Sequence, residues 1–165
     1  MSGTSFSMDL GRLFAVVDGG LRNMGGTGEL ASSIGESLVS STLERFEESK
    51  DPDGNAWTPS ARAWGEGLKG KARRGLGLKG RGGRGFGKTL VNKGLLRGSI
   101  TYEATPQRVV VGTNVVYAAI HQFGGMAGRG RKVRIPARPY VGISEEDVLE
   151  CRSMMTDFLA AGFGS

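Results

Sequence analysis

The stretch SITYEATPQRVVV, residues 99–111, decides the class of fold. Ile100 and Tyr102 alternate with polar residues, which is the two-residue period of a β-strand with one buried face. Three valines follow at 109–111, after a break at residues 105–107. Two such runs separated by a short break predict an antiparallel β-hairpin.

Upstream of this hairpin, apolar residues recur at three- and four-residue steps, which is the period of a helix. Residues 8–24 predict one amphipathic helix, with Ser7 or Asp9 as its cap. A second helix is expected from Thr27, its cap, to about Lys50. Its predicted buried face consists of Leu30, Ile34, Leu38, Leu43 and Phe46.

Downstream of the hairpin, shorter elements are expected. Asn114 is predicted to cap a short helix that ends at Gly124. The side chains expected to point inward from it are Val116, Tyr117, Ile120 and Phe123. A glycine- and arginine-rich loop follows over 124–131. A third strand is predicted over 133–135, and the prolines after it confine it to a short or edge element.

A last helix closes the chain. Ser144 and Asp147 form a capping-box pattern, and Gly162 is expected to end the helix. Its predicted buried face consists of Val148, Cys151, Met155, Phe158 and Leu159. Helices and a small antiparallel sheet together predict an α+β fold, in which the sheet packs against two or three helices. The 165 residues fit a single domain, 1–165.

Between a turn predicted at residues 51–55 and the hairpin, residues 65–88 are almost all glycine, lysine or arginine. Such a segment buries too little apolar area to offset its ordering entropy, so we expect a flexible basic arm. The chain carries a net charge of +6, which favours an anionic partner. That partner is either nucleic acid or an acidic protein surface such as the second helix. The arm residues expected to contact it are Arg73, Arg74, Lys79, Arg81 and Arg84.

The sequence contains no recognisable set of catalytic residues. His121, the single histidine, has no metal-ligand spacing and no nucleophile beside it. Cys151 is the single cysteine, and we expect it to be buried as a small apolar residue. The glycine run before Lys88 lacks the spacing of a nucleotide-binding loop. We therefore expect no enzyme activity, no metal and no cofactor, and no apolar run is long enough to span a membrane.

Five groups of motifs occur in a characteristic order along the chain. They are DPDG at 51–54 with WTP at 57–59, LVNKGLLRGSI at 90–100, VGT at 111–113, YA at 117–118 with IHQFGG at 120–125, and IPARPYVGIS at 135–144. In these motifs the chain resembles the virion morphogenesis (tail completion) proteins of Mu-like phages. The resemblance extends over about residues 45 to 148.

The resemblance implies a non-enzymatic structural protein of the virion neck, assembled in the host cytoplasm. Such a protein completes the tail and joins it to the head as a subunit of a homo-oligomeric ring, which we expect to be a hexamer. Its partners are then copies of itself, neighbouring neck, connector and tail proteins, and the DNA that passes through the channel. The alternative is a nucleic-acid-binding protein that uses the glycine- and arginine-rich segment.

The motifs also suggest where subunits or rings meet. Pro136 and Pro139 fix a stiff bend, which we expect to hold Arg138 outward with little entropy left to lose. The residues predicted to contact a neighbouring subunit or ring are His121, Gln122, Phe123, Arg138, Pro139 and Tyr140.

Overall fold

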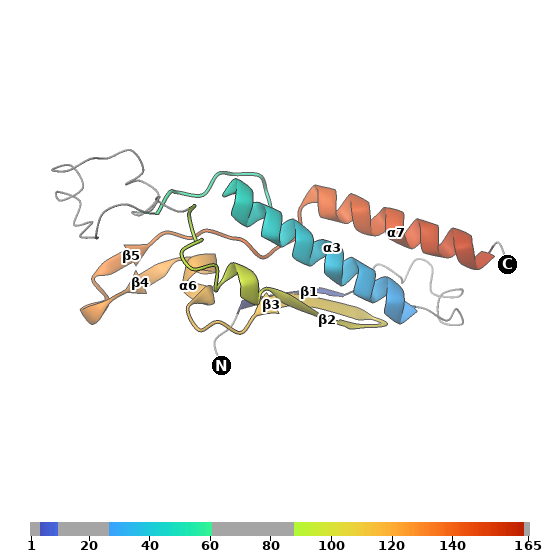
Figure 1. The fold of residues 1–165 in the computed structure, drawn as a ribbon, viewed down its shortest axis with the longest axis horizontal. Helices are drawn as coiled ribbons and strands as arrows, with labels where there is room; N and C mark the ends of the chain where they lie inside the picture. Colours follow the sequence, from blue (N-terminus) through green and yellow to red (C-terminus); the bar gives the residue numbers. More distant parts are fainter. Residues whose placement is uncertain (1–3, 10–26, 61–87, 164–165) are drawn as a thin grey trace.

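Three layers make up the body of the protein, in a computed structural model that describes residues 4–9, 27–60 and 88–163 (Figure 1). The first layer is a three-stranded antiparallel sheet in the order β1 (Thr4–Asp9), β3 (Arg108–Thr113), β2 (Thr101–Thr105). Helix α3 (Thr27–Glu48) packs on this sheet, and helix α7 (Glu145–Phe163) packs on α3. This arrangement confirms the predicted α+β fold.

The predicted hairpin is the centre of the sheet. Tyr102 pairs with Val111 and Ala104 pairs with Val109 on the face that α3 covers, where both valines are buried. The helix approaches this face closely at Gly35, where a Cβ atom would lie 2.3 Å from Cδ2 of Tyr102. Glycine therefore sets the distance between α3 and the sheet at this point.

The predicted helix over residues 8–24 is wrong at its start. Met8 and Asp9 belong to strand β1 and pair with Val109 and Arg108 of β3. Ser7 lies in the same strand, so neither predicted cap stands at a helix terminus. The partner of β1 comes about a hundred residues later in the chain, and no local period reveals that pairing. The remainder of this prediction lies outside the described residues.

The second predicted helix and the turn after it are confirmed. The core of the protein includes Leu30, Ile34, Leu38 and Phe46 from α3, with Leu43 packed at its margin. After the helix, the backbone N–H of Asn55 donates to Oδ1 of Asp51 at 2.7 Å, and Gly54 adopts a φ of +82°. This turn brings Trp57 back against the C-terminal end of α3, where its ring packs on Phe46.

The short helix differs from its prediction. Helix α6 comprises Ala118–Phe123, its first cap residue is Tyr117, and no side chain caps it, so Asn114 does not have the predicted role. Because the helix begins four residues after Asn114, its buried face is also shifted. Ala118 is buried, whereas Val116 and Phe123 are 75% and 73% exposed and Tyr117 is also exposed.

The segment after α6 forms a second sheet. Strands β4 (Gly125–Ala127) and β5 (Val133–Ile135) pair antiparallel around the 3-10 turn η2 (Arg129–Arg131). The third strand is therefore confirmed, but much of the predicted 124–131 loop is a strand and turn. We call residues 125–135 the distal hairpin, because it lies at one end of the molecule in Figure 1.

The last helix begins as predicted. Ser144 Oγ accepts from the backbone N–H of Asp147 at 3.1 Å, and Asp147 Oδ2 accepts from the backbone N–H of Ser144 at 2.7 Å. This reciprocal pair is a capping box. Cys151 and Met155 are buried on the predicted face, and the helix continues through Gly162 to Phe163.

Candidate subunit interface

The motifs at residues 57–59, 120–124 and 138–141, far apart in the sequence, meet in one place, which we call the motif junction. Trp57 is positioned by the turn after α3, and its Nε1 donates to the carbonyl of Pro139 at 2.8 Å. The ring of Phe46 packs against two other aromatic rings. Its centroid lies 5.5 Å from that of Trp57 and 5.2 Å from that of Tyr140. The aromatic cluster therefore fixes the segment after β5 against α3.

Gln122 fastens α6 to the same segment. Its Oε1 accepts from the backbone N–H groups of Tyr140 and Val141 at 3.0 and 3.1 Å. Its Nε2 donates to the carbonyl of Val141 at 2.8 Å. One amide side chain thus satisfies three backbone groups of an irregular segment that has no strand partner for them.

Arg138 corrects the prediction made from the prolines. Its side chain is not held outward, because the residue is only 5% exposed. Nε donates to the carbonyl of Thr58 at 2.6 Å and an Nη donates to that of Pro59 at 3.3 Å. Burial lowers the pKa of the guanidinium from its ordinary value, although an arginine stays charged near neutral pH. The bend directs the guanidinium towards backbone carbonyls that accept no hydrogen bond within a helix or a strand.

The six residues predicted to contact a neighbour therefore divide. Tyr140 is fully buried and donates its hydroxyl to the carbonyl of Ala118 at 3.3 Å, so it braces the fold as Arg138 does. His121, Gln122 and Pro139 are half-buried, and Phe123 is the one with an exposed side chain. A role of this group in contacts between subunits stays a prediction.

A cavity of about 320 Å³ opens beside the junction. Leu90, Val91 and Leu96 supply apolar walls, and Leu95, at its edge, is exposed. His121 lines the cavity too, and its Nδ1 is buried with no hydrogen-bond partner among the described residues. Burial and the neighbouring charge of Arg138 lower the pKa of this imidazole, so it is neutral near pH 7. Lys88, Lys93 and Arg138 also line the cavity, so it disfavours a cation.

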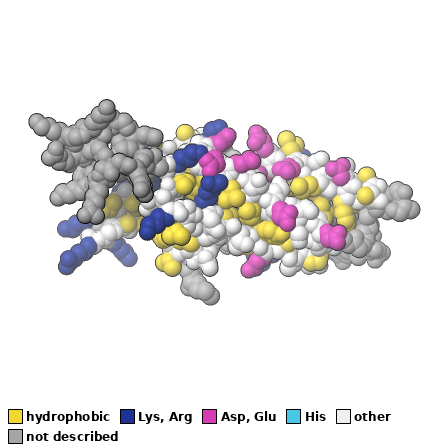
Figure 2. All heavy atoms as spheres, in the orientation of Figure 1, with side chains coloured by type: hydrophobic (Ala, Val, Ile, Leu, Met, Phe, Trp, Pro, Cys, Tyr) yellow, Lys and Arg dark blue, Asp and Glu magenta, His cyan; other side chains and the backbone are white. Residues whose placement is uncertain are grey.

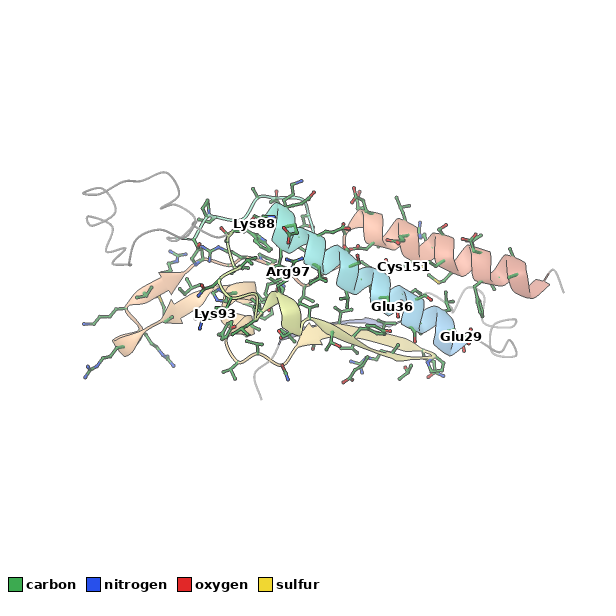
Figure 3. The ribbon with its side chains drawn as sticks, viewed as in Figure 1. Glu29, Glu36, Lys88, Lys93, Arg97 and Cys151 are labelled. Carbon is green, nitrogen blue, oxygen red and sulfur yellow. The ribbon has the colours of Figure 1, made fainter. Side chains whose placement is uncertain are left out.

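Basic side chains surround the C-terminal end of α3. Lys88 and Arg97 both pair with Glu47, and Figure 3 shows them beside this end of the helix. A hydrogen bond from Lys88, followed by the charges of Arg97 and Lys88, lowers the pKa of Glu47 against a smaller opposing effect of burial. Lys88 is the last residue of the predicted arm and the only arm residue described. The predicted contacts of Arg73, Arg74, Lys79, Arg81 and Arg84 lie outside the described residues.

The described part of the chain offers no metal site and no activated thiol. No group of three or more His, Cys, Asp or Glu residues is close enough there to hold a metal ion. Cys151 is buried, as predicted, and burial together with the charges of Asp147 and Glu150 raises its thiol pKa to about 11. A thiol with this pKa is almost entirely protonated at pH 7 and is a poor nucleophile. None of the described helices is long and apolar enough to cross a membrane.

Comparison with known proteins agrees with the motif resemblance. The profile of the phage virion morphogenesis family matches residues 8–160. Mu-like prophage FluMu G protein 2 of Haemophilus influenzae is 49% identical over 72 residues, which cover 44% of this chain and 52% of that protein. The putative capsid assembly protein G of Escherichia phage Mu is 34% identical over 110 residues, which cover 66% of this chain and 64% of that protein. The chain thus spans between half and two thirds of the length of these curated relatives. No solved structure matches it significantly.

Proposed function

Because the chain belongs to the phage virion morphogenesis family, we propose that it is a structural subunit of the virion neck. In this role it completes the tail and joins it to the head as one copy in a homo-oligomeric ring. Membership of the family supports a structural or assembly role in a phage virion. The name of the phage Mu relative, a putative capsid assembly protein, is in line with this. Beyond family membership, we propose the neck location, the ring and its sixfold symmetry.

The single observation that carries the proposal is a contrast between two neighbouring regions. The motif junction is held together by hydrogen bonds, whereas large apolar side chains around it are exposed. Arg138, Gln122 and Trp57 tie the motifs into one rigid frame through hydrogen bonds to backbone groups. Large apolar side chains nevertheless stay exposed on the segments that this frame supports. They are Leu95, Val116, Tyr117, Phe123, Met126 and Val133. Two of them, Leu95 and Tyr117, line the same cavity, and exposed apolar side chains that lie together are typical of protein–protein contact surfaces.

A subunit with unlike contact surfaces on two sides binds its copies head to tail, and such contacts generate a ring when the rotation closes. A closed ring around the channel also suits a protein placed between a tail and a head. The described residues contain no metal cluster and no reactive thiol that would favour a catalytic role instead.

Deletion of the gene from the phage or prophage that encodes it tests this function. We expect lysates to contain DNA-filled heads and separate tails, with infectious titre restored by the wild-type gene in trans. Electron microscopy of the lysate distinguishes these particles from whole virions. Joined virions at normal titre in the deletion strain would contradict the proposal.

The alternative function, nucleic-acid binding through the arm, involves residues 65–88, of which only Lys88 is described. Binding of duplex DNA by the purified protein, measured at several salt concentrations, separates the two functions. A nucleic-acid-binding protein loses affinity steeply as salt rises, with a slope set by the number of phosphates it contacts. The neck-subunit proposal requires no such binding by the free protein.

A further inference from the structure

The distal hairpin is built to project from the body. It pairs only with itself, because β4 and β5 form a sheet separate from β1, β3 and β2. Among the described elements it packs mainly against α6, where Gly125 approaches Ile120. A two-stranded hairpin with so little support is marginally stable alone, so it gains from a surface that covers it.

The composition of the hairpin fits a protein contact. Met126 and Val133 are 51% and 53% exposed, and the register places them on opposite faces of the hairpin. Exposed basic side chains surround them, and residues 124–140 contain no acidic residue. These basic residues are Arg129, Arg131, Lys132 and Arg134. Methionine and arginine are both enriched in protein–protein interfaces.

A surface of the opposite charge lies elsewhere on the same chain. Helices α3 and α7 border a groove of about 460 Å³, which we call the acidic groove. Glu36, Glu44 and Glu150 line it and are exposed, Met154 adds an apolar side chain, and the rest of its lining is serine. Among the described residues none of these three glutamates has an ion-pair partner, whereas Asp147 nearby is already paired with Arg45.

The two surfaces are too far apart to meet within one subunit. Figure 1 places β4 and β5 at one end of the elongated molecule, and α3 and α7 extend towards the other end. Figure 2 shows the same division, with Lys and Arg side chains at the hairpin end and Asp and Glu side chains over the helices. Opposite charges on separate surfaces of one chain are complementary between two copies of that chain.

From this complementarity we propose that the distal hairpin of one subunit docks in the acidic groove of the next. The cations of the hairpin face Glu44 and Glu150, and Met126 packs near Met154. The contact joins unlike surfaces, so each subunit repeats it, and the repeat closes a ring. This inference rests on the proposed function as a ring subunit and identifies the surfaces that build the ring.

A charge-swap experiment in phage production tests the docking. The hairpin variant carries Lys132→Glu and Arg134→Glu, and the groove variant carries Glu44→Lys and Glu150→Lys. A control with the same loss of net charge as the hairpin variant, Lys50→Glu with Arg108→Glu, alters two exposed residues that line neither the groove nor the hairpin, and Lys50 also loses its exposed ion pair with Glu48. Each variant is supplied in trans to the deletion strain, singly and in pairs.

We expect each swapped variant alone to lower infectious titre at least 100-fold, while the control stays within threefold of wild type. Co-expression of the two swapped variants should restore titre to within tenfold of wild type. In the mixture, the glutamates of the hairpin variant meet the lysines of the groove variant, and the two remaining native surfaces also match. A ring in which the two variants alternate therefore has opposite charges at every contact. A ring of either variant alone has like charges at every contact.

Several outcomes would overturn the docking. Wild-type titre from either swapped variant excludes it, and so does co-expression that gives no more titre than the variants alone. The second result would indicate that the hairpin binds another acidic protein or DNA. Melting temperatures of the purified variants check folding, and the milder pair Lys132→Gln with Arg134→Gln should lower titre in the same direction. If the deletion strain itself makes normal virions, the proposed function fails instead.

Discussion

In the sequence, the distal hairpin lies between two of the three segments of the motif junction, yet the two regions have opposite physical characters. Arg134 in β5 is exposed and has a methionine as its cross-strand neighbour. Arg138, four residues later, is buried and donates to two backbone carbonyls. The same residue type therefore stabilises the subunit at one position and is available to a partner at the other.

Several residues of the recognisable motifs stabilise the fold of the subunit. The residues that carry the resemblance, such as Trp57, Gln122, Arg138 and Tyr140, satisfy backbone groups of irregular segments or fill the core. Such roles depend on one particular side chain, because the backbone group loses its hydrogen-bond partner when that side chain is removed. Variants in either region should separate the two roles, stabilising the subunit and contacting a partner.

Removing Asp147 should have the largest effect on stability. Asp147 pairs with Arg45, which also donates to the carbonyl of Gly142 at 3.0 Å, and it forms half of the capping box. Asp147→Ala leaves a buried guanidinium without its partner, which costs roughly 3 to 5 kcal/mol in the free energy of unfolding. Urea denaturation measures the change. The matched control Asp157→Ala, on an exposed part of the same helix, should stay within about 0.5 kcal/mol of wild type.

The same carboxylate should make stability depend on pH. Burial tends to raise the pKa of Asp147, but hydrogen bonds from Ser144 and the charge of Arg45 outweigh it and hold the pKa below the ordinary value of 3.8. A carboxyl with a lowered folded-state pKa contributes stability above its unfolded-state pKa and loses it as pH falls through the folded-state value. Melting temperature should therefore fall below about pH 4. A smaller fall in Asp147→Ala than in wild type would confirm the source.

Arg138→Ala should destabilise the subunit by about 2 kcal/mol, because it removes a nearly buried charged side chain together with its hydrogen bonds to the carbonyls of Thr58 and Pro59. Arg138→Lys keeps the charge but not the planar set of donors, so we expect an intermediate loss. Denaturation curves of the three proteins give the order. Wild-type stability in Arg138→Ala would restore the view that this side chain serves only a partner.

Gly124, where the junction meets the hairpin, should tolerate no side chain. Its φ is +72°, and a Cβ atom there would lie 2.8 Å from the backbone nitrogen of Ala137. Gly124→Ala should cost roughly 1 to 3 kcal/mol, because a φ of +72° with a ψ of 179° is a combination that glycine alone adopts readily, and the close contact adds to this cost. Gly98→Ala is the control, because a Cβ atom at Gly98 would have no neighbour within 4 Å and the φ there is ordinary. Equal stability of the two variants would show that the chain can shift at Gly124.

Patterns in the sequence predicted those elements that are determined by residues close to one another in the chain. The period of α3, the alternation of Tyr102 with its polar neighbours, and the capping box at Ser144 each depend on residues within one or two turns. The errors at β1 and at Arg138 came from distant partners. Strand β1 needs β3, and the inward direction of Arg138 depends on carbonyls about eighty residues earlier in the chain. Strand β4, with the sequence GMA, carries no strand period that could distinguish it from a loop.

The smallest effect on stability is expected at Arg134, in the distal hairpin. Its side chain is exposed, so Arg134→Ala should change the free energy of unfolding by no more than about 0.5 kcal/mol. Titre should nevertheless fall, because the docking proposal places this cation against the acidic groove of the next subunit. Arg138→Ala should show the reverse balance, with a large loss of stability and a fall in titre that follows the loss of folded protein. Growth at a lower temperature should therefore rescue Arg138→Ala and leave Arg134→Ala unrescued. Loss of stability in Arg134→Ala as large as in Arg138→Ala would mean that the hairpin belongs to the core of the subunit.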